Sequence, residues 1–137
     1  MQYITHRRFK AEADCGIVNL PYGTEIEERG GWLFHGDKRL CTATSENAHQ
    51  YFARNDDGEG ALRGTLTQAI QKELRLREGE TPTRRSERWE KVWSDPVCQQ
   101  YRRPEHADYW LWNHAFFNAP IEDLQHIAAL VGARKGA

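Results

Sequence analysis

The spacing of apolar residues changes part-way along this chain, and the change constrains the fold more than any other feature of the sequence. In residues 1–44, bulky or β-branched residues alternate with polar ones, as in "YITHRRFKA", which is the period of a strand with one buried face. Further on, apolar residues recur every four positions, as on one side of an amphipathic helix, at Leu62, Leu66, Ile70 and Leu74. The sequence therefore predicts an α+β protein whose strands come first.

Glycine pairs mark the turns of the first half. Gly30-Gly31 and Gly36-Asp37 stand at hairpin spacing between strand-like segments. We therefore predict four or five short antiparallel strands, which form a small N-terminal β-sheet or partial barrel. This β subdomain of 44 residues has too few apolar residues to be stable alone, so it is expected to pack on the helical remainder of the chain.

Residues 45–137 are predicted to be helical. Ser45 is a candidate N-cap for a first helix, which carries Ala48, Tyr51 and Phe52 on one face. The stripe from Leu62 to Leu74 marks a second helix, and a third has a tryptophan-rich face and a basic remainder. A last helix begins with Pro120 just inside it and ends at Gly132. The residues of the third helix are Trp89, Val92 and Trp93 on its apolar face, and Arg84, Arg85, Arg88 and Lys91 around the rest.

At 137 residues, the chain is long enough to bury a core without disulfides or metal ions. We predict a single domain, residues 1–137, in which a C-terminal bundle of three to four helices shares one core with the sheet. The charge of the chain argues against a protein that coats bulk nucleic acid, because the formal net charge is only −1.

The positive charge is mostly arginine, with 14 arginines against 5 lysines. Because a guanidinium holds a phosphate or carboxylate through two parallel hydrogen bonds, this excess favours recognition of discrete anions. A codon preference for arginine explains the same excess equally well.

Nothing in the sequence predicts secretion or a membrane partner. Cys15, Cys41 and Cys98 are odd in number and far apart, which fits neither a disulfide framework nor a thiolate zinc site. The basic start "MQYITHRRFK" has no apolar segment behind it, and no run approaches the length of a membrane span. We expect a cytoplasmic protein.

Motifs that carry chemistry are missing from the sequence. The loop "ARNDDGEG" has the acidic residues of a calcium loop, but placing Gly58 sixth puts Ala53 first and Gly64 twelfth, where oxygen ligands are needed. A solvated turn fits better, with Asp56 or Asp57 capping the next helix. The histidines lack the pairings of zinc enzymes, and no nucleophile elbow or glycine-rich phosphate loop occurs. We predict no catalytic residue, no metal and no cofactor.

The segment "QQYRRPEHADYWLWNHAFF" concentrates arginine, histidine and aromatic residues. For Trp110, Trp112 and Phe116 the simpler interpretation is a core position, because large aromatic residues dominate cores. Pro104, however, favours an extended backbone at Arg103. Arginines beside rings and an amide are the components of a nucleotide pocket, in which rings stack a base and guanidinium groups hold phosphates. The ligand-binding candidates are Arg102, Arg103, Arg54, Asn55, Tyr101, Trp93, Asn113 and His114.

A second candidate anion site lies near the start of the chain, in "ITHRRFK". There His6, Arg7 and Arg8 are adjacent in sequence. The simpler alternative is that they occupy the solvent-facing positions of an edge strand, where charges prevent unwanted pairing with other chains.

Six segments that cover most of the chain carry a resemblance to a known group. They are "YITHRRFK", "VNLPYGTE", "SENAHQYFARNDDGEG", "RGTLTQAIQKEL", "RWEKVWSDPVCQQYRRPEHADYWLWNHAFFNA" and "IEDLQHIAALVGA". With them the chain resembles small proteins carried by prophages of Firmicutes. Within that group it is similar to the Thoeris anti-defence sponges, phage proteins that bind and hide the nucleotide second messengers of bacterial immune systems. The similarity implies a cytoplasmic protein of the bacterial host cell, which sequesters a cyclic ADP-ribose isomer or a cyclic oligonucleotide without catalysis.

Such a protein needs tight recognition of a small ligand and little net positive charge, which suits this composition. A homo-oligomer would be natural, because symmetric assemblies can form pockets at subunit boundaries. Two other function classes stay open. One is a protein–protein inhibitor of a defence system, such as an anti-CRISPR protein. The other is a small hydrolase of the same messenger, with His106, Asp108 or His114 in acid–base roles.

Overall fold

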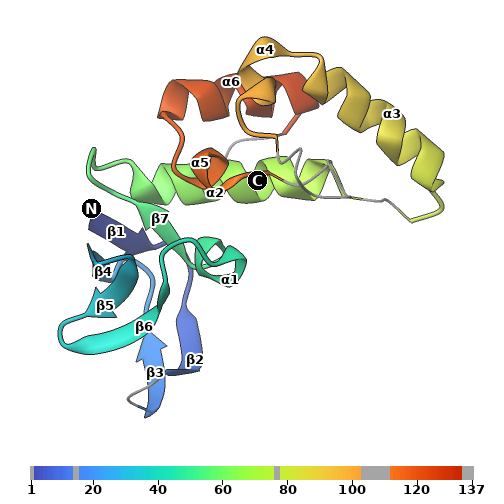
Figure 1. Cartoon of the computed structure of the whole chain (residues 1–137). Coiled ribbons are helices and arrows are strands. Elements are labelled where there is room, and N and C mark those ends of the chain that lie inside the picture. The colour runs from blue at the N-terminus through green and yellow to red at the C-terminus, as the bar shows by residue number, and fades with distance from the viewer. Residues whose placement is uncertain (1, 14–15, 76–77, 103–111, 134–137) are drawn as a thin grey trace. The chain divides into compact units, whose positions relative to one another are not determined.

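The computed structural model describes residues 2–13, 16–75, 78–102 and 112–133 (Figure 1). The chain forms two compact units, unit 1 (Met1–Thr65) and unit 2 (Leu66–Ala137). The elements of unit 1 are β1 (Gln2–Thr5), β2 (Phe9–Ala13), β3 (Gly16–Leu20), β4 (Glu25–Arg29), β5 (Trp32–His35), β6 (Lys38–Thr42), α1 (Glu46–His49), β7 (Phe52–Arg54) and the first residues of α2 (Gly60–Glu73). Unit 2 contains the rest of α2, α3 (Pro82–Trp93), α4 (Pro96–Gln99), α5 (His114–Phe117) and α6 (Ile121–Val131).

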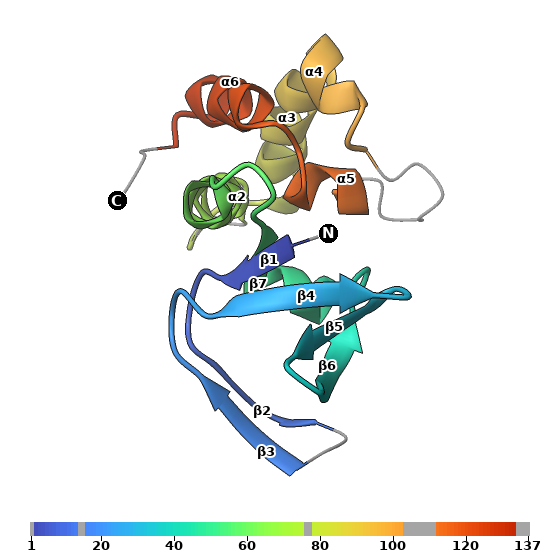
Figure 2. The ribbon, with the colours of Figure 1, turned by 90° about the vertical axis from the view of Figure 1, so that its left-hand side faces the viewer.

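Unit 1 is built on an antiparallel five-stranded sheet with the strand order β6-β5-β4-β1-β7. β2 and β3 form a separate two-stranded sheet, the β2–β3 hairpin. Figure 2 shows that β1 continues into β2 and that β3 continues into β4. The predicted turns are present, because Gly30, Gly31 and Gly36 adopt the positive φ angles that tight hairpins require. The α+β class and the N-terminal antiparallel sheet are therefore confirmed, and the described strands do not close into a barrel.

Strand β7 corrects the prediction for residues 45–52. The predicted first helix carried Tyr51 and Phe52 on one face, but α1 ends at His49 and Phe52 begins β7. Phe52 pairs with Thr5 and Ala53 with Ile4, and both of these β7 residues are buried. Here pairing with β1 overrides a local pattern too short to distinguish a helix from a strand.

The core of unit 1 lies where the sheet and the β2–β3 hairpin bring their apolar residues together. Tyr3, Ile26 and Leu33 are buried from three neighbouring strands of the sheet. Phe9 of β2 adds its ring to the same cluster, with its centroid 5.0 Å from that of Phe52. The hairpin therefore shares the core of the sheet.

A buried hydroxyl fixes the bend where β1 leaves the sheet. The side chain of Thr5 is fully buried, and its Oγ1 donates to the carbonyl of Pro21 (2.8 Å) and accepts from the amide of Thr24 (2.8 Å). The backbone of Thr5 also bonds Thr24 and Gly23. The segment from β1 to β2 and the segment from β3 to β4 are therefore bonded to each other where both leave the five-stranded sheet.

The first turns of α2 lie very close to β1, and two glycines permit this approach. A Cβ at Gly60 would stand 2.5 Å from Cγ2 of Ile4, and one at Gly64 would stand 2.3 Å from Cγ of His6. Gly60 and Gly64 are one helical turn apart, and Ile4 and His6 are two residues apart near the end of β1, so each pair shares a face.

Unit 2 is held together by capped helices and an aromatic core. Thr81, Asp95 and Asn113 accept backbone N–H groups at the starts of α3, α4 and α5, and Gly132 ends α6 in the left-handed conformation. α3, α4 and α6 pack against one another (Figure 1). Leu66, Ile70 and Leu74 of α2, which belong to unit 2, are buried as well.

The aromatic side chains that the structure describes in unit 2 form one cluster. The rings of Trp112 and Phe116 are stacked with their centroids 4.1 Å apart, and Trp93 lies 4.7 Å from Trp112. Trp89 stacks on Trp93 at 5.5 Å. The predicted core positions of Trp112 and Phe116 are confirmed, because both are buried, and Trp110 lies outside the described residues.

Replacing the Thr5 hydroxyl by a methyl group tests the bend. Thr5→Val keeps the shape of the side chain but removes two buried hydrogen bonds, and it leaves the amide of Thr24 without its side-chain acceptor. We expect the free energy of unfolding in urea to fall by about 1–3 kcal/mol. Thr24→Val is the matched control, because its hydroxyl makes one exposed bond to Pro21 and should cost at most about 0.5 kcal/mol. Equal losses in the two variants would contradict the role of Thr5.

Gly64→Ala tests the close approach of α2 to β1. At an unhindered helical position this change stabilises by about 1 kcal/mol. Here the new Cβ meets His6, so we expect a loss of roughly 1–3 kcal/mol in the free energy of unfolding. Thr65→Ala, at an exposed position of the same turn, is the control and should change stability by no more than about 0.5 kcal/mol. A stabilised Gly64→Ala variant would show that the helix stands further from the strand.

Candidate functional site

The predicted ligand-binding residues fall in both units. Unit 1 holds Arg54 at the end of β7 and Asn55 in the loop before α2, and it also holds the second candidate site. Unit 2 holds Trp93, Tyr101, Arg102, Asn113 and His114. Arg103 lies outside the described residues, as do the hydrolase candidates His106 and Asp108.

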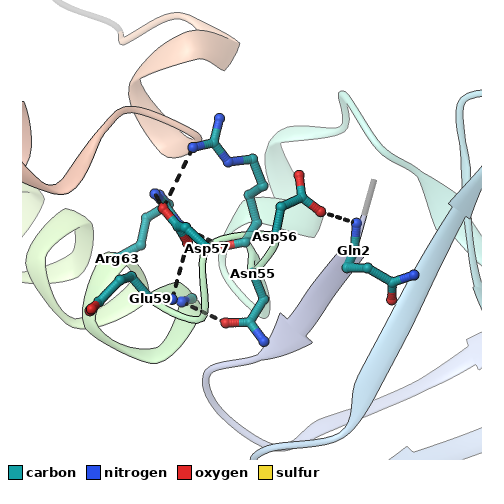
Figure 3. Close-up of polar contacts among 8 residues, drawn as sticks. Gln2, Asn55, Asp56, Asp57, Glu59 and Arg63 are labelled. Carbon is teal, nitrogen blue, oxygen red and sulfur yellow. Dashed lines mark hydrogen bonds and ion pairs between the residues drawn. The ribbon is translucent and has the colours of Figure 1, made fainter.

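The loop before α2 is organised around a fully buried arginine, Arg63. Its guanidinium donates to both oxygens of Asp57, at 2.7 and 3.2 Å, and to the carbonyl of Arg54 at 2.5 Å. Figure 3 shows the side chains of Arg63 and Asp57 pointing toward one another. The guanidinium of Arg54 lies 3.7 Å from the same carboxylate. Two cations therefore share one anion.

Polar side chains of this loop also satisfy the start of the helix. Asn55 accepts the amide of Gly60, and Asp57 accepts the amide of Glu59, which precedes α2 directly. Asp56 accepts the backbone N–H of Gln2 at 2.5 Å, so the loop is also tied to β1. The first amide of the helix is therefore accepted by Asn55 and not, as predicted, by Asp56 or Asp57, and the oxygen of Asn55 is occupied within the protein.

The environment of Asp57 favours its ionised form. The hydrogen bonds from Arg63 hold the pKa of this carboxyl well below its usual range, and the amide of Glu59 acts in the same direction. Burial acts in the opposite direction but is outweighed. The Asp57 carboxylate therefore stays charged through the whole neutral range, as a structural anion beside Arg63.

The residues of the second candidate site have separate partners in unit 1. Nε2 of His6 lies 3.1 Å from the carbonyl of His49, and burial lowers the pKa of His6. Arg7 lies over the ring of Tyr51, and Arg8 donates to Asn19. The three side chains therefore do not converge on one point in this structure.

In unit 2, several candidate residues support the helices. Tyr101 is buried and donates its hydroxyl to Asp123 (2.6 Å), and burial, followed by this contact, raises the pKa of the Tyr101 hydroxyl. Asn113 caps α5 by accepting the amide of Phe116, and its Nδ2 donates to the carbonyl of Gln100. Trp93 belongs to the aromatic cluster described above.

Arg102 and His114 are the more accessible candidates of unit 2. Arg102 is half-buried and forms an antiparallel bridge with the backbone of Trp112. His114 is exposed on α5, with Nε2 3.0 Å from the amide nitrogen of Asn118.

A groove of about 290 Å³ runs along α3 and is lined by a second set of cations. The sequence predicts these cations on the polar side of the helix but assigns them no function. The lining residues of this α3 groove are Glu80, Arg84, Glu87, Arg88 and Lys91. Arg84, Arg88 and Lys91 follow the spacing i, i+4, i+7, which places them on one face of the helix. This spacing is the signal that the sequence offers for the groove.

The cations of the α3 groove differ in their partners. Arg88 is paired with Glu80 and also donates to the carbonyl of Arg75 at 2.7 Å. Arg84 and Lys91 are exposed and have no ion pair within the described parts of the chain. The groove therefore offers one neutralised guanidinium and two accessible cations.

The two cysteines that the structure describes are poor nucleophiles. Burial raises the pKa of the Cys41 thiol to about 11, and burial together with Asp95 raises that of Cys98 to about 12. Cys15 lies outside the described residues. Among residues 2–13, 16–75, 78–102 and 112–133, no three His, Cys, Asp or Glu side chains come together in a way that could hold a metal ion.

Comparison with known proteins gives no match, neither to a family model nor to a curated protein nor to a solved structure. In the part of the chain that the structure describes, no helix has the length and apolar character needed to cross a membrane.

Asp57→Asn tests the pair between the buried Arg63 and the partly exposed Asp57 through its pH dependence. The folded pKa of Asp57 lies below its unfolded value, so the pair stabilises the fold above about pH 4, and this stability is lost as the pH falls below that value. We expect the variant to lose about 1.5–3 kcal/mol at pH 7 and to change less than the wild type between pH 7 and pH 3 in urea unfolding.

The matched control is Asp37→Asn, which makes the same charge change in the exposed turn between β5 and β6. It should keep both the stability at pH 7 and the pH profile of the wild type. A pH profile for Asp57→Asn identical to that of the wild type would show that Arg63 does not depend on this carboxylate.

Proposed function

We propose that this protein binds a phosphorylated small molecule, of the class of nucleotide second messengers, and holds it without chemical change. The observation that carries the proposal is the α3 groove, a hollow in which Arg84 and Lys91 present unpaired positive charge beside Arg88. Ammonium and guanidinium groups on one side of a groove are the usual means of holding phosphate oxygens.

The character of the described side chains supports binding without catalysis. A nucleophile needs a lowered pKa or an adjacent base, but the thiols of Cys41 and Cys98 have raised pKa values. His6, which could act as a base, is half-buried, with its Nε2 3.1 Å from the carbonyl oxygen of His49. The hydrolase alternative would depend on His106, Asp108 or His114. The first two lie outside the described residues, and His114 is exposed on α5 with its Nε2 3.0 Å from the amide nitrogen of Asn118.

The similarity to the Thoeris anti-defence sponges supports the same proposal and makes it more specific. On that basis the ligand is a cyclic ADP-ribose isomer or a cyclic oligonucleotide, and the protein acts in the cytoplasm of a bacterial host as a phage or prophage anti-defence protein. Assembly into a homo-oligomer belongs to the same proposal. The proposal does not require that the helices form a bundle around a core shared with the sheet, which stays a prediction.

A second candidate function is inhibition of a defence protein by direct contact. It is favoured by two large apolar residues on the surface of unit 1: Ile17 of β3 is 79% exposed and Tyr22, just after β3, is 63% exposed. Exposed apolar side chains near one another in the chain are a common feature of protein-binding surfaces.

Two double variants that each remove two cations decide between the candidate ligand sites. The protein is incubated with cyclic ADP-ribose isomers and cyclic oligonucleotides, separated from free ligand and denatured by heat, and the released molecule is identified by mass spectrometry. The wild type should return the ligand intact. Arg84→Ala/Lys91→Ala should weaken binding by about tenfold or more, because each lost charge-assisted bond contributes about 1.5–3 kcal/mol. Arg102→Ala/Arg103→Ala is the control and should retain the ligand.

Each other outcome of this experiment contradicts a stated part of the proposal. Loss of binding only in Arg102→Ala/Arg103→Ala would place the site in the arginine- and aromatic-rich segment before α5 and would refute the α3 groove. Ligand returned as fragments would identify a hydrolase. A wild type that retains no messenger would refute sequestration and leave the protein-directed inhibitor.

A further inference from the structure

We infer that the site on α3 takes a nucleotide unit with a single phosphate in contact with the protein, and that its base or other apolar part occupies a second groove beside the first. This inference rests on the proposed function and specifies the ligand class of the same site. It is carried by an adjoining hollow of about 170 Å³ in unit 2. The residues that line this apolar groove are Glu73, Leu74, Arg88, Lys91, Val92, Leu130 and Val131.

The two grooves share a boundary. Arg88 and Lys91 line both of them, and Val92, the next residue of α3, lines only the apolar groove. The lysine side chain is suited to this position, because its aliphatic stem covers apolar surface while its ammonium group reaches the phosphate side. A ligand that extends from one groove into the other would therefore pass from a cationic to an apolar environment at Lys91.

The apolar groove has buried residues at its base and partly exposed residues at its edge, and this edge, Leu130 and Val131, is called the rim. Leu74 and Val92 are buried, so they belong to the packed interior of unit 2 and provide a fixed surface. Val131 is half-buried and Leu130 is 43% exposed, an unusual exposure for a large apolar residue of this protein. A planar or aliphatic group placed there would remove apolar surface of both partners from water.

The charges of the α3 groove limit the ligand to few negative charges. Arg88 and Glu80 neutralise one another, so Arg84 and Lys91 remain against Glu87. The difference is one positive charge, which suits a phosphate monoester or diester better than a triphosphate.

The wild-type protein tests the inference with three ligands: adenosine monophosphate, ribose 5-phosphate and adenosine, measured by titration calorimetry. Ribose 5-phosphate keeps the phosphate and sugar but lacks the base, whereas adenosine lacks the phosphate. Burying about 55 Å² of apolar surface corresponds to roughly a tenfold gain in affinity. Adenosine monophosphate should therefore bind at least about tenfold more tightly than either fragment. Equal affinities for adenosine monophosphate and ribose 5-phosphate would refute the apolar subsite.

Two variants assign the base to the apolar groove. Leu130→Gln/Val131→Thr keeps the size of both side chains but makes the rim polar, so it should weaken adenosine monophosphate about fivefold or more and leave ribose 5-phosphate within about twofold. Lys91→Gln should weaken both. Ala129→Gln, which adds a polar side chain at an exposed residue of α6 that lines neither groove, should weaken neither. Unchanged binding of adenosine monophosphate by the rim variant would refute the inference.

Failure of this inference and failure of the proposed function give different results. If the wild type retains a messenger but binds adenosine monophosphate no more tightly than ribose 5-phosphate, sequestration stands and the apolar subsite is wrong. If the wild type retains neither a messenger nor adenosine monophosphate, both are wrong.

Discussion

Burying a guanidinium is costly unless its charge and its hydrogen bonds are compensated, and unit 1 contains one such group in Arg63. Its partners are the carbonyl of Arg54, at the end of β7, and the carboxylate of Asp57, in the loop that leads into the same helix. The loop and the start of α2 therefore stabilise each other. Gly60 and Gly64 allow the helix to lie against β1, and a larger side chain at either position would push the helix and its arginine away.

The same arginine shows why the sequence predicts the fold better than the details of its packing. A four-residue spacing selects Leu62, Leu66, Ile70 and Leu74 as the buried stripe, but a helix turns once in 3.6 residues, so such a stripe drifts around its axis. In the structure Leu62 is only half-buried and Arg63 is buried instead. Arg63 lies seven residues before Ile70, which is two helical turns, but a pattern of apolar residues cannot reveal a charged one at that position. Its partner lies in a loop whose conformation the sequence leaves open.

Candidate binding residues are predicted from the types of side chain present, and those types serve structural roles equally well. Tyr101 and Asn113 have the hydroxyl and amide that a nucleotide pocket uses, yet they bond Asp123 and the backbone of Gln100 and Phe116. The prediction of a core position is correct for Trp112 and Phe116, because burial follows from size and apolarity alone. What a polar side chain bonds depends on neighbours distant in sequence, and composition does not contain that information.

Structural roles also account for part of the arginine excess, so the number of arginines is not itself a sign of an anionic ligand. In the described parts of the chain, at least seven arginines make an interaction inside the protein, either with a ring, with a carboxylate, or with a carbonyl or amide oxygen. They are Arg7, Arg8, Arg29, Arg39, Arg54, Arg63 and Arg88. Planar guanidinium groups suit such contacts, so a protein rich in them needs no anionic ligand to explain its composition. Recognition of a ligand therefore depends on the position of the cations rather than on their number. Arg84 and Lys91 are exposed and line a groove that adjoins an apolar hollow, and the proposed binding of a phosphorylated molecule depends on this combination.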